Sequence, residues 1–194
     1  GGAAPEIDIV VELIGGYGVA KELVLKAIEN GKHVVTANKA LLTVDGNEIF
    51  AAAQARGVMV AFEAAVAGGI PIIKALREGL TANRIQWLAG IINGTTNFIL
   101  SEMRDKGLDF DVVLKEAQRL GYAEADPTFD IEGVDAAHKA TLMSAIAFGI
   151  PVQFDKAYVE GITKLGAADI KYAEQLGYRI KLLGISKRTD KGIE

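Results

Sequence analysis

Residues 7–39 read IDIVVELIGGYGVAKELVLKAIENGKHVVTANK, and this stretch decides the fold. Its first segment, residues 7–14, is short, β-branched and nearly continuous in apolar residues, which predicts a parallel strand buried on both faces. A helix is predicted over residues 19–29, with Gly31 as its stop signal, and a second strand over residues 34–37. This order predicts a βαβ unit with helices packed on a parallel sheet.

The pattern continues with a predicted helix over residues 46–56 and a third strand over residues 58–62. Residues 1–66 therefore resemble the second half of a dinucleotide-binding, Rossmann-like domain. The turn at residues 16–18 (Gly-Tyr-Gly) lacks the dinucleotide fingerprint, because Lys21 occupies the third glycine position. A plain strand-to-helix turn is the favoured interpretation of that spacing.

Polar residues stand at the carboxyl end of the predicted second strand. Thr36 ends the strand and Lys39 opens the helix that follows. Ligands bind at this edge of open parallel sheets. A cation is poorly placed at a helix N-terminus, which favours a functional role for Lys39 over a merely solvated one.

Residues 67–194 predict a second, α+β domain. Residues 84–92 show partial alternation, typical of a strand in another sheet, and residues 93–97 (NGTTN) supply N-cap residues for a helix over 98–104. Free N–H groups at such a helix start also attract anions. The remaining elements expected are helices over residues 110–120 and 167–176, a strand over residues 178–185 and a turn at residues 189–192.

Residues 117–139 read AQRLGYAEADPTFDIEGVDAAHK and concentrate ionisable side chains. A helix is predicted to end at Gly121, and another runs over residues 134–148 with Asp135 and Lys139 on one face. Alone, that pair is typical of a surface ion pair. The acids on the preceding loop favour a functional interpretation: a site for a small substrate with an ammonium group, where the lysine gives or takes a proton. Those acids are Glu124, Asp126 and Asp130.

Composition excludes several classes of function. The chain has 194 residues, half of them hydrophobic, a net charge of −4 and no cysteine. It therefore has no basic footprint for nucleic acid, no disulfide scaffold and no zinc–thiolate site. Neither a signal peptide nor an apolar run long enough to span a membrane is present, so a cytoplasmic protein is expected. His138 has no second ligand nearby at metal-binding spacing and is expected to be structural.

The run A-x-x-x-G-Y-A-x-x-D-P-x-x-D-I-x-G-x-D-x-x-x-K over residues 117–139 resembles the homoserine dehydrogenase signature at every fixed position. The resemblance implies reversible, NAD(P)-dependent hydride transfer between L-aspartate 4-semialdehyde and L-homoserine, in threonine, methionine and isoleucine biosynthesis. Without the first half of the sheet an apolar strand edge is exposed, which favours association, so a homodimer or higher homo-oligomer formed through the substrate domain is expected, with no nucleic-acid or membrane partner.

The resemblance assigns roles to individual residues. Lys139 is the expected acid/base, with Lys39 and Asp135 as further catalytic residues. Expected substrate contacts are Gly94, Thr95, Tyr122, Glu124 and Asp130, although Tyr122 could equally be a core aromatic. Expected cofactor contacts are Gly15, Gly16, Thr36 and Lys39. A monovalent cation such as sodium is expected at the Glu63 side chain and the carbonyls of Val66, Gly68 and Ile70, where hard oxygen ligands fit such an ion.

Homoserine dehydrogenases carry a glycine-rich phosphate loop before the segment equivalent to residues 7–14. The chain is therefore expected to be a fragment lacking that loop and a C-terminal end, and to be inactive as given. Two alternatives remain open: a non-catalytic substrate-binding or dimerisation fragment, and a dehydrogenase of a related aldehyde.

Overall fold

The computed structural model describes residues 4–194, which fall into two compact units. The first unit contains the residues up to 86 together with residues 138–157, and the second contains residues 87–137 and 158–194. The boundary predicted after residue 66 therefore lies inside the first unit. The short helices α3 (Ala64–Ala67) and α4 (Ile72–Lys74) contact each other, which keeps this connection within one unit.

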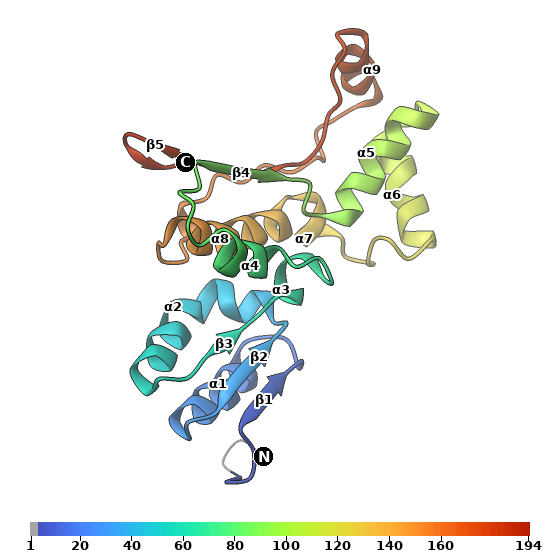
Figure 1. Cartoon of the computed structure of the whole chain (residues 1–194). Helices are drawn as coiled ribbons and strands as arrows, with labels where there is room; N and C mark the ends of the chain where they lie inside the picture. Colours follow the sequence, from blue (N-terminus) through green and yellow to red (C-terminus); the bar gives the residue numbers. More distant parts are fainter. Residues whose placement is uncertain (1–3) are drawn as a thin grey trace. The chain divides into compact units, whose positions relative to one another are not determined.

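The first unit is built on a three-stranded parallel sheet in the order β1-β2-β3 (Figure 1). Its strands are β1 (Ile9–Glu12), β2 (His33–Thr36) and β3 (Val60–Ala61). Val10 pairs with Val34, which pairs in turn with Val60. The parallel βαβ arrangement predicted from the sequence is confirmed.

Helices α1 (Gly18–Glu29) and α2 (Lys39–Arg56) contact each other and form the core of this unit. Their fully buried side chains include Val24, Ile28, Leu41, Leu42 and Ile49. Each such side chain contributes roughly 1.5–3 kcal/mol by leaving water. Helix α2 begins at residue 39 rather than at the predicted residue 46, because the Asn38 side chain caps it by accepting the Leu41 N–H.

The prediction that the first strand is buried on both faces is wrong. Ile9 and Val11 are 56% and 60% exposed, and Val35 on β2 is 40% exposed. Alternate residues such as Val34 are fully buried instead. In the described part of the unit, the helices thus cover one face of the sheet and leave an apolar face open.

The rest of the first unit comes from two further segments. A π-helical turn, η1 (Ala75–Gly79), directly continues α4. The second segment contains most of α8 (Val134–Phe148) and the 3-10 turn η2 (Phe154–Lys156). Asn47 anchors the stretch between them, since its side chain donates to the Val152 carbonyl and accepts the Val152 N–H at 3.0 and 2.9 Å.

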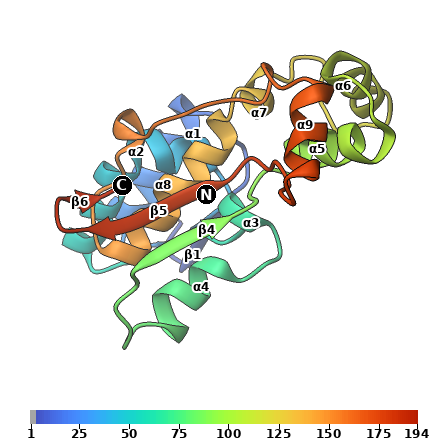
Figure 2. The same cartoon turned by 90° about the horizontal axis from the view of Figure 1, so that it is seen from above.

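The second unit holds an antiparallel sheet of β4 (Trp87–Gly90), β5 (Gly184–Thr189) and β6 (Gly192–Ile193), with β4 beside β5 in Figure 2. The turn predicted at residues 189–192 is confirmed as the β5–β6 connection. The strand predicted over residues 178–185 begins only at Gly184. Lys181 in the preceding extended segment instead bonds to Asn97 and Ser101 of a helix.

That helix is α5 (Gly94–Lys106), and it packs against α6 (Phe110–Arg119) and α9 (Ala167–Gln175). Helix α5 starts before the predicted residue 98 because Asn93 caps it. Their shared core includes Ile99, Leu100, Met103, Val113 and Ile170. A short helix, α7 (Thr128–Ile131), precedes α8 and was not predicted. No helix of the described residues is long and apolar enough to cross a membrane.

Candidate functional site

The best-defined polar cluster in the second unit centres on Asn93. Its Nδ2 donates to Asp130 Oδ1 at 2.7 Å and to Asp135 Oδ2 at 2.9 Å. Its Oδ1 accepts the Thr96 N–H at 2.8 Å, which caps α5. One asparagine side chain therefore joins the start of α5 to two carboxylates from the α7–α8 region.

Both carboxylates of this cluster are sheltered from water. Asp135 is buried at 5% exposure and Asp130 is half-buried. Two carboxylates held together by one amide donor form a candidate site for a small cationic group. An ammonium group has three donors and suits two converging carboxylates. The structure therefore brings together Asp130, a predicted substrate contact, and Asp135, a predicted catalytic residue.

The backbone around Gly133 fixes the separation of these two aspartates. Gly133 has φ +82° and lies between α7, which carries Asp130, and α8, which begins just before Asp135. A Cβ at Gly133 would meet the Glu160 carbonyl oxygen at 2.8 Å, and one at Gly161 would meet Glu132 Cα at 2.6 Å. Only glycines allow this close approach, which is secured by the Ile162 N–H donating to the Ile131 carbonyl at 2.8 Å.

Gly94, Thr95 and Tyr122 lie at the start of α5 and on the loop after α6. Thr95 Oγ1 donates to the Tyr122 carbonyl at 2.8 Å, and the Tyr122 ring packs against Phe98 in a tilted arrangement with centroids 4.6 Å apart. Tyr122 is 57% exposed, so it is not a core aromatic. Gly94 is also exposed, and a Cβ on this residue would meet no atom within 4 Å, so its backbone can approach a ligand.

Glu124 and Asp126 are exposed on the loop before α7. Gln118 holds this loop by donating to the Glu124 carbonyl at 3.1 Å, so the contact involves the backbone of Glu124 and not its carboxylate. The hydroxyl and the N–H of Thr128 hold the pKa of Asp126 below its usual value. The structure therefore joins Asp130 and Asp135 through Asn93 but does not bring Glu124 into that cluster.

The two predicted lysines belong to the first unit. Lys139 lies on α8 one helical turn after Asp135, and Lys39 is the first residue of α2. Both are half-buried. The shared helix face of Asp135 and Lys139 is confirmed by the continuous helix, because residues four apart in an α-helix are neighbours.

The predicted cofactor residues gather at the carboxyl ends of β1 and β2. Gly15 and Gly16 have φ of 79° and 72°, and neither position has any atom within 4 Å of where a Cβ would stand. Thr36 is buried at 2% exposure and donates its hydroxyl to Glu12 at 2.6 Å. The exposed glycine turn leaves room for a cofactor to approach the protein backbone. The Thr36 hydroxyl, in contrast, is hydrogen-bonded to Glu12 and joins the ends of the two strands.

The predicted cation ligands lie around α3. The Glu63 carboxylate accepts the N–H groups of Ile73 and Lys74 at 2.7 and 2.9 Å, and the Ile70 carbonyl accepts the Ile72 N–H at 2.8 Å. Val66 is buried, and Gly68 has φ +58°. Within residues 4–194 no group of three or more His, Asp or Glu side chains could hold a metal, so a cation here would depend on backbone carbonyls.

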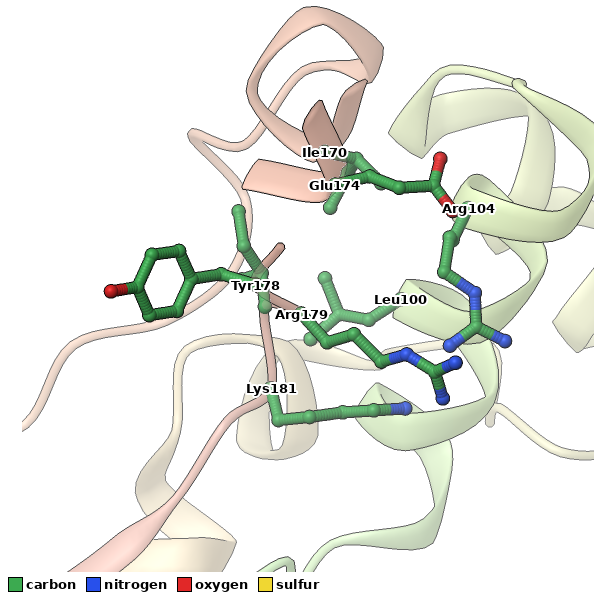
Figure 3. Close-up of a pocket in the computed structure, with 8 residues that line it drawn as sticks. Leu100, Arg104, Ile170, Glu174, Tyr178, Arg179 and Lys181 are labelled. Carbon is green, nitrogen blue, oxygen red and sulfur yellow. The ribbon is translucent and has the colours of Figure 1, made fainter. Parts of the chain in front are cut away.

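A separate small hollow lies between α5, α9 and the segment after α9 (Figure 3). It has room for about one water molecule and includes none of the predicted site residues. Figure 3 shows the charged ends of Arg104, Arg179 and Lys181 pointing to the same side. Burial lowers the pKa of Lys181, and the charges of Arg104 and Arg179 lower it further. Lys181 Nζ donates to Asn97 Oδ1 and Ser101 Oγ at 2.6 and 2.8 Å, so the Lys181 side chain holds the segment after α9 against α5.

Three residues that organise the site were missed by sequence reasoning as site residues. Asn93 was recognised only as an N-cap, while Asn38 and the buried Glu12 were given no role. The available signals were an acid ending an apolar strand, and an asparagine before each of two helices. Their partners lie 22 to 42 residues away, which local patterns do not reveal.

Comparison with known proteins gives the family. Residues 2–63 match the model of the homoserine dehydrogenase NAD-binding domain, and residues 71–193 match the homoserine dehydrogenase model. The curated homoserine dehydrogenases of Pseudomonas aeruginosa and Neisseria gonorrhoeae are 75% and 71% identical over 98% and 99% of this chain, and the chain spans 44% of each.

Solved structures agree with these matches. A homoserine dehydrogenase from Thiobacillus denitrificans superposes with a TM-score of 0.95 at 79% identity, over 97% of this chain and 44% of that one. A hyperthermophilic archaeal homoserine dehydrogenase in complex with NADPH superposes with a TM-score of 0.76 at 28% identity, over 96% and 54%. The family models match most of the chain, and the chain therefore belongs to the homoserine dehydrogenase family.

Proposed function

We propose that the protein containing this chain is a homoserine dehydrogenase, which interconverts L-aspartate 4-semialdehyde and L-homoserine with NAD(P) as the redox partner. The observation that carries the proposal is the Asn93 cluster, in which one amide holds Asp130 and Asp135 together. Two sheltered carboxylates suit the ammonium group that both amino acids carry.

Substrate binding is assigned to the second unit. Asp130 and Asp135 hold the ammonium group, while Asn93 fixes the carboxylates without neutralising them. Gly94 and Thr95 lie in the first turn of α5, and the anion-attracting N–H groups of a helix N-terminus support assigning them to the substrate carboxylate. Tyr122 and Glu124 border the loop that enters this region, and their exposure assigns them a peripheral role.

Proton transfer is assigned to Lys139. In the direction of homoserine oxidation this lysine accepts the hydroxyl proton, and in the reverse direction it returns the proton to the nascent alkoxide. The cofactor supplies or accepts the hydride. Lys39 stands at the carboxyl edge of the parallel sheet, where ligands of such sheets bind, and is assigned a supporting catalytic role.

Cofactor binding is assigned to the first unit, at Gly15, Gly16 and Thr36. The open space around both glycines supports this assignment, because a dinucleotide needs close backbone approach at the end of a parallel strand. The NAD-binding family match over residues 2–63 covers the same elements.

A monovalent cation at Glu63, Val66, Gly68 and Ile70 is the part of the proposal that rests on the fewest contacts. The Glu63 carboxylate already accepts two N–H groups, although each carboxylate oxygen has a second lone pair. The cation would order the connection after β3 rather than take part in chemistry.

We also infer a homo-oligomer that works in the cytoplasm. Support comes from the exposed face of the β4–β5 pair, where Trp87 and Ile185 are 64% and 56% exposed and Ala89 pairs with Ile185. An apolar sheet face of this kind is typical of a surface covered by another copy.

The test is a steady-state assay of the full-length protein with homoserine and either NAD⁺ or NADP⁺, beside a panel of other β-substituted alcohols. We expect homoserine to have the highest kcat/KM. NADPH binding without turnover of any alcohol would favour a non-catalytic protein, and preference for another alcohol would assign a related dehydrogenase.

A further inference from the structure

Glu12 is a buried carboxylate at the end of β1 that the proposed chemistry does not use. It is 3% exposed. Its Oε1 accepts the N–H groups of Ile14 and Gly15 at 2.8 and 3.1 Å, and its Oε2 accepts the Thr36 hydroxyl at 2.6 Å. A carboxylate is costly to bury unless donors surround it, so these three hydrogen bonds are what allows an acid at this position.

Asn38 extends the same network from the other strand. Its N–H donates to Thr36 Oγ1 at 2.9 Å, and its Nδ2 donates to the Gly16 carbonyl at 2.7 Å. The turn after β1 and the turn after β2 are therefore joined in a closed ring of hydrogen bonds. Glu12 holds the beginning of the glycine turn, and Asn38 holds its end.

The glycine turn needs such ties because its own sequence does not define its shape. Gly15 and Gly16 both have left-handed φ, and no neighbouring atom lies within 4 Å of a Cβ position at either residue. Glycine samples left-handed and right-handed backbone almost equally in a free chain. Packing therefore does not select this conformation, whereas the hydrogen bonds from Glu12 and Asn38 do.

We infer that Glu12 is a positioning residue for the cofactor: its buried carboxylate holds the turn at residues 14–16 in the shape that receives a dinucleotide. The inference rests on the proposed function. A turn that is already ordered before binding loses less conformational freedom when the ligand arrives, which raises affinity. Glu12 itself touches no reacting atom, so its effect falls on cofactor affinity and not on homoserine binding.

The experiment compares three variants of the full-length protein: Glu12→Ala, Glu12→Gln and, as a control, Asp45→Ala. Asp45 accepts a hydrogen bond from Lys21 of α1 at 2.7 Å in the same unit, so its removal tests the loss of a polar contact outside residues 14–16. NADPH affinity is measured by fluorescence titration, the homoserine KM by steady-state kinetics, and amide exchange of residues 13–16 by mass spectrometry or NMR.

Glu12→Ala is expected to raise the NADPH Kd by about tenfold or more, with the homoserine KM within about twofold of wild type. Glu12→Gln keeps an oxygen for the Ile14 and Gly15 N–H groups, so its Kd should lie between wild type and Glu12→Ala. Faster amide exchange should be confined to residues 13–16. Asp45→Ala should leave the Kd unchanged.

An NADPH Kd within about twofold of wild type for Glu12→Ala would overturn the inference, as would faster exchange throughout the first unit, which indicates a general stability role. If Glu12→Ala does not fold, Glu12→Gln carries the test, because it removes the charge and one acceptor oxygen at the same position; unchanged NADPH affinity together with unchanged amide exchange of residues 13–16 in Glu12→Gln would also overturn the inference. Failure of the wild-type protein to bind NADPH would defeat the proposed function as well, whereas normal wild-type binding with unchanged variants defeats only the role of Glu12.

Discussion

Asn38 and Asn93 perform the same local task in the two units. Each is an N-cap whose Oδ1 accepts a backbone N–H three residues later, at 3.1 Å for Asn38 and 2.8 Å for Asn93. They differ in what Nδ2 holds. In the first unit it holds the neutral carbonyl of Gly16, and in the second it holds the carboxylates of Asp130 and Asp135.

This difference separates a positioning network from a binding site. In the first unit one carboxylate, Glu12, receives three donors, so its hydrogen-bonding capacity is directed inward. In the second unit one amide donates to two carboxylates, which brings two acidic side chains together. The first arrangement holds a turn, and the second is the one proposed to bind the substrate ammonium group.

The largest effect is expected from Lys139→Ala in the full-length protein. Lys139 follows Asp135 by one turn of α8, and removal of the acid/base should lower kcat by about 10²–10⁴-fold with a smaller change in KM. Lys156→Ala, at an exposed position of the same unit, is the control. Near-normal kcat in Lys139→Ala would move the proton-transfer role to another group, with Lys39 the next candidate.

Asn93→Asp and Asn38→Asp test the comparison of the two caps directly. Asn93→Asp places a third carboxylate against Asp130 and Asp135 and should lower the free energy of unfolding by about 3 kcal/mol at pH 7. Asn38→Asp keeps the cap but loses the bond to Gly16, which should cost about 1 kcal/mol. Urea unfolding at pH 7 gives both values.

The pH dependence of Asn93→Asp follows from the same crowding. The carboxyl group introduced at position 93 would lie against two existing carboxylates, so it retains its proton to a higher pH in the folded state than in the unfolded chain. The stability of Asn93→Asp should therefore fall as pH rises through the range in which the introduced group ionises, and its loss of stability relative to wild type should be smaller at pH 4 than at pH 7. Equal losses for Asn93→Asp and Asn38→Asp at both pH values would remove the distinction between the two clusters.

Gly161→Ala tests the backbone contact that sets the spacing of Asp130 and Asp135. A Cβ at this position would meet Glu132 Cα at 2.6 Å, so the substitution should cost about 1–3 kcal/mol. Gly79→Ala is the control, because no atom lies within 4 Å of its Cβ position. Thermal unfolding of both variants would show whether the contact is as tight as the geometry indicates.

The smallest effect is expected from Glu124→Leu. An exposed carboxylate at the rim of a site contributes at most about 1 kcal/mol, so the homoserine KM should rise less than about fivefold. NADPH affinity should not change. A rise above about thirtyfold would show that Glu124 closes onto the substrate and belongs with Asp130 and Asp135.

The sequence predicted those elements that local patterns define. The β-branched run at residues 9–12 indicated the parallel sheet, and apolar periodicity indicated helices α1, α6 and α8. The prediction that β1 is buried on both faces was wrong. An apolar run shows that a strand can be buried, but it does not show whether other elements cover each face. The start of α2 was missed because the side-chain cap by Asn38 outweighs weak periodicity.

Only part of the candidate site was predicted, and the reason is related. Asp130, Asp135 and Lys139 stand in one signature stretch, so spacing and family resemblance both reach them. Asn93 and Glu12 act through contacts between distant segments, and a local pattern records only a cap or a strand residue there. The close approach of Gly161 to Glu132 is equally invisible, since nothing in the sequence pairs those two positions.

The most direct test of this account is Asp130→Asn in the full-length protein, with the homoserine KM and the NADPH Kd measured side by side. The substitution preserves the shape of the Asn93 cluster but removes one of its two charges. The account predicts a homoserine KM raised by about tenfold to a hundredfold, as expected for the loss of a charged hydrogen bond of about 1.5–3 kcal/mol, with the NADPH Kd within about twofold of wild type. An unchanged homoserine KM, or equal losses of homoserine and NADPH affinity, would contradict it.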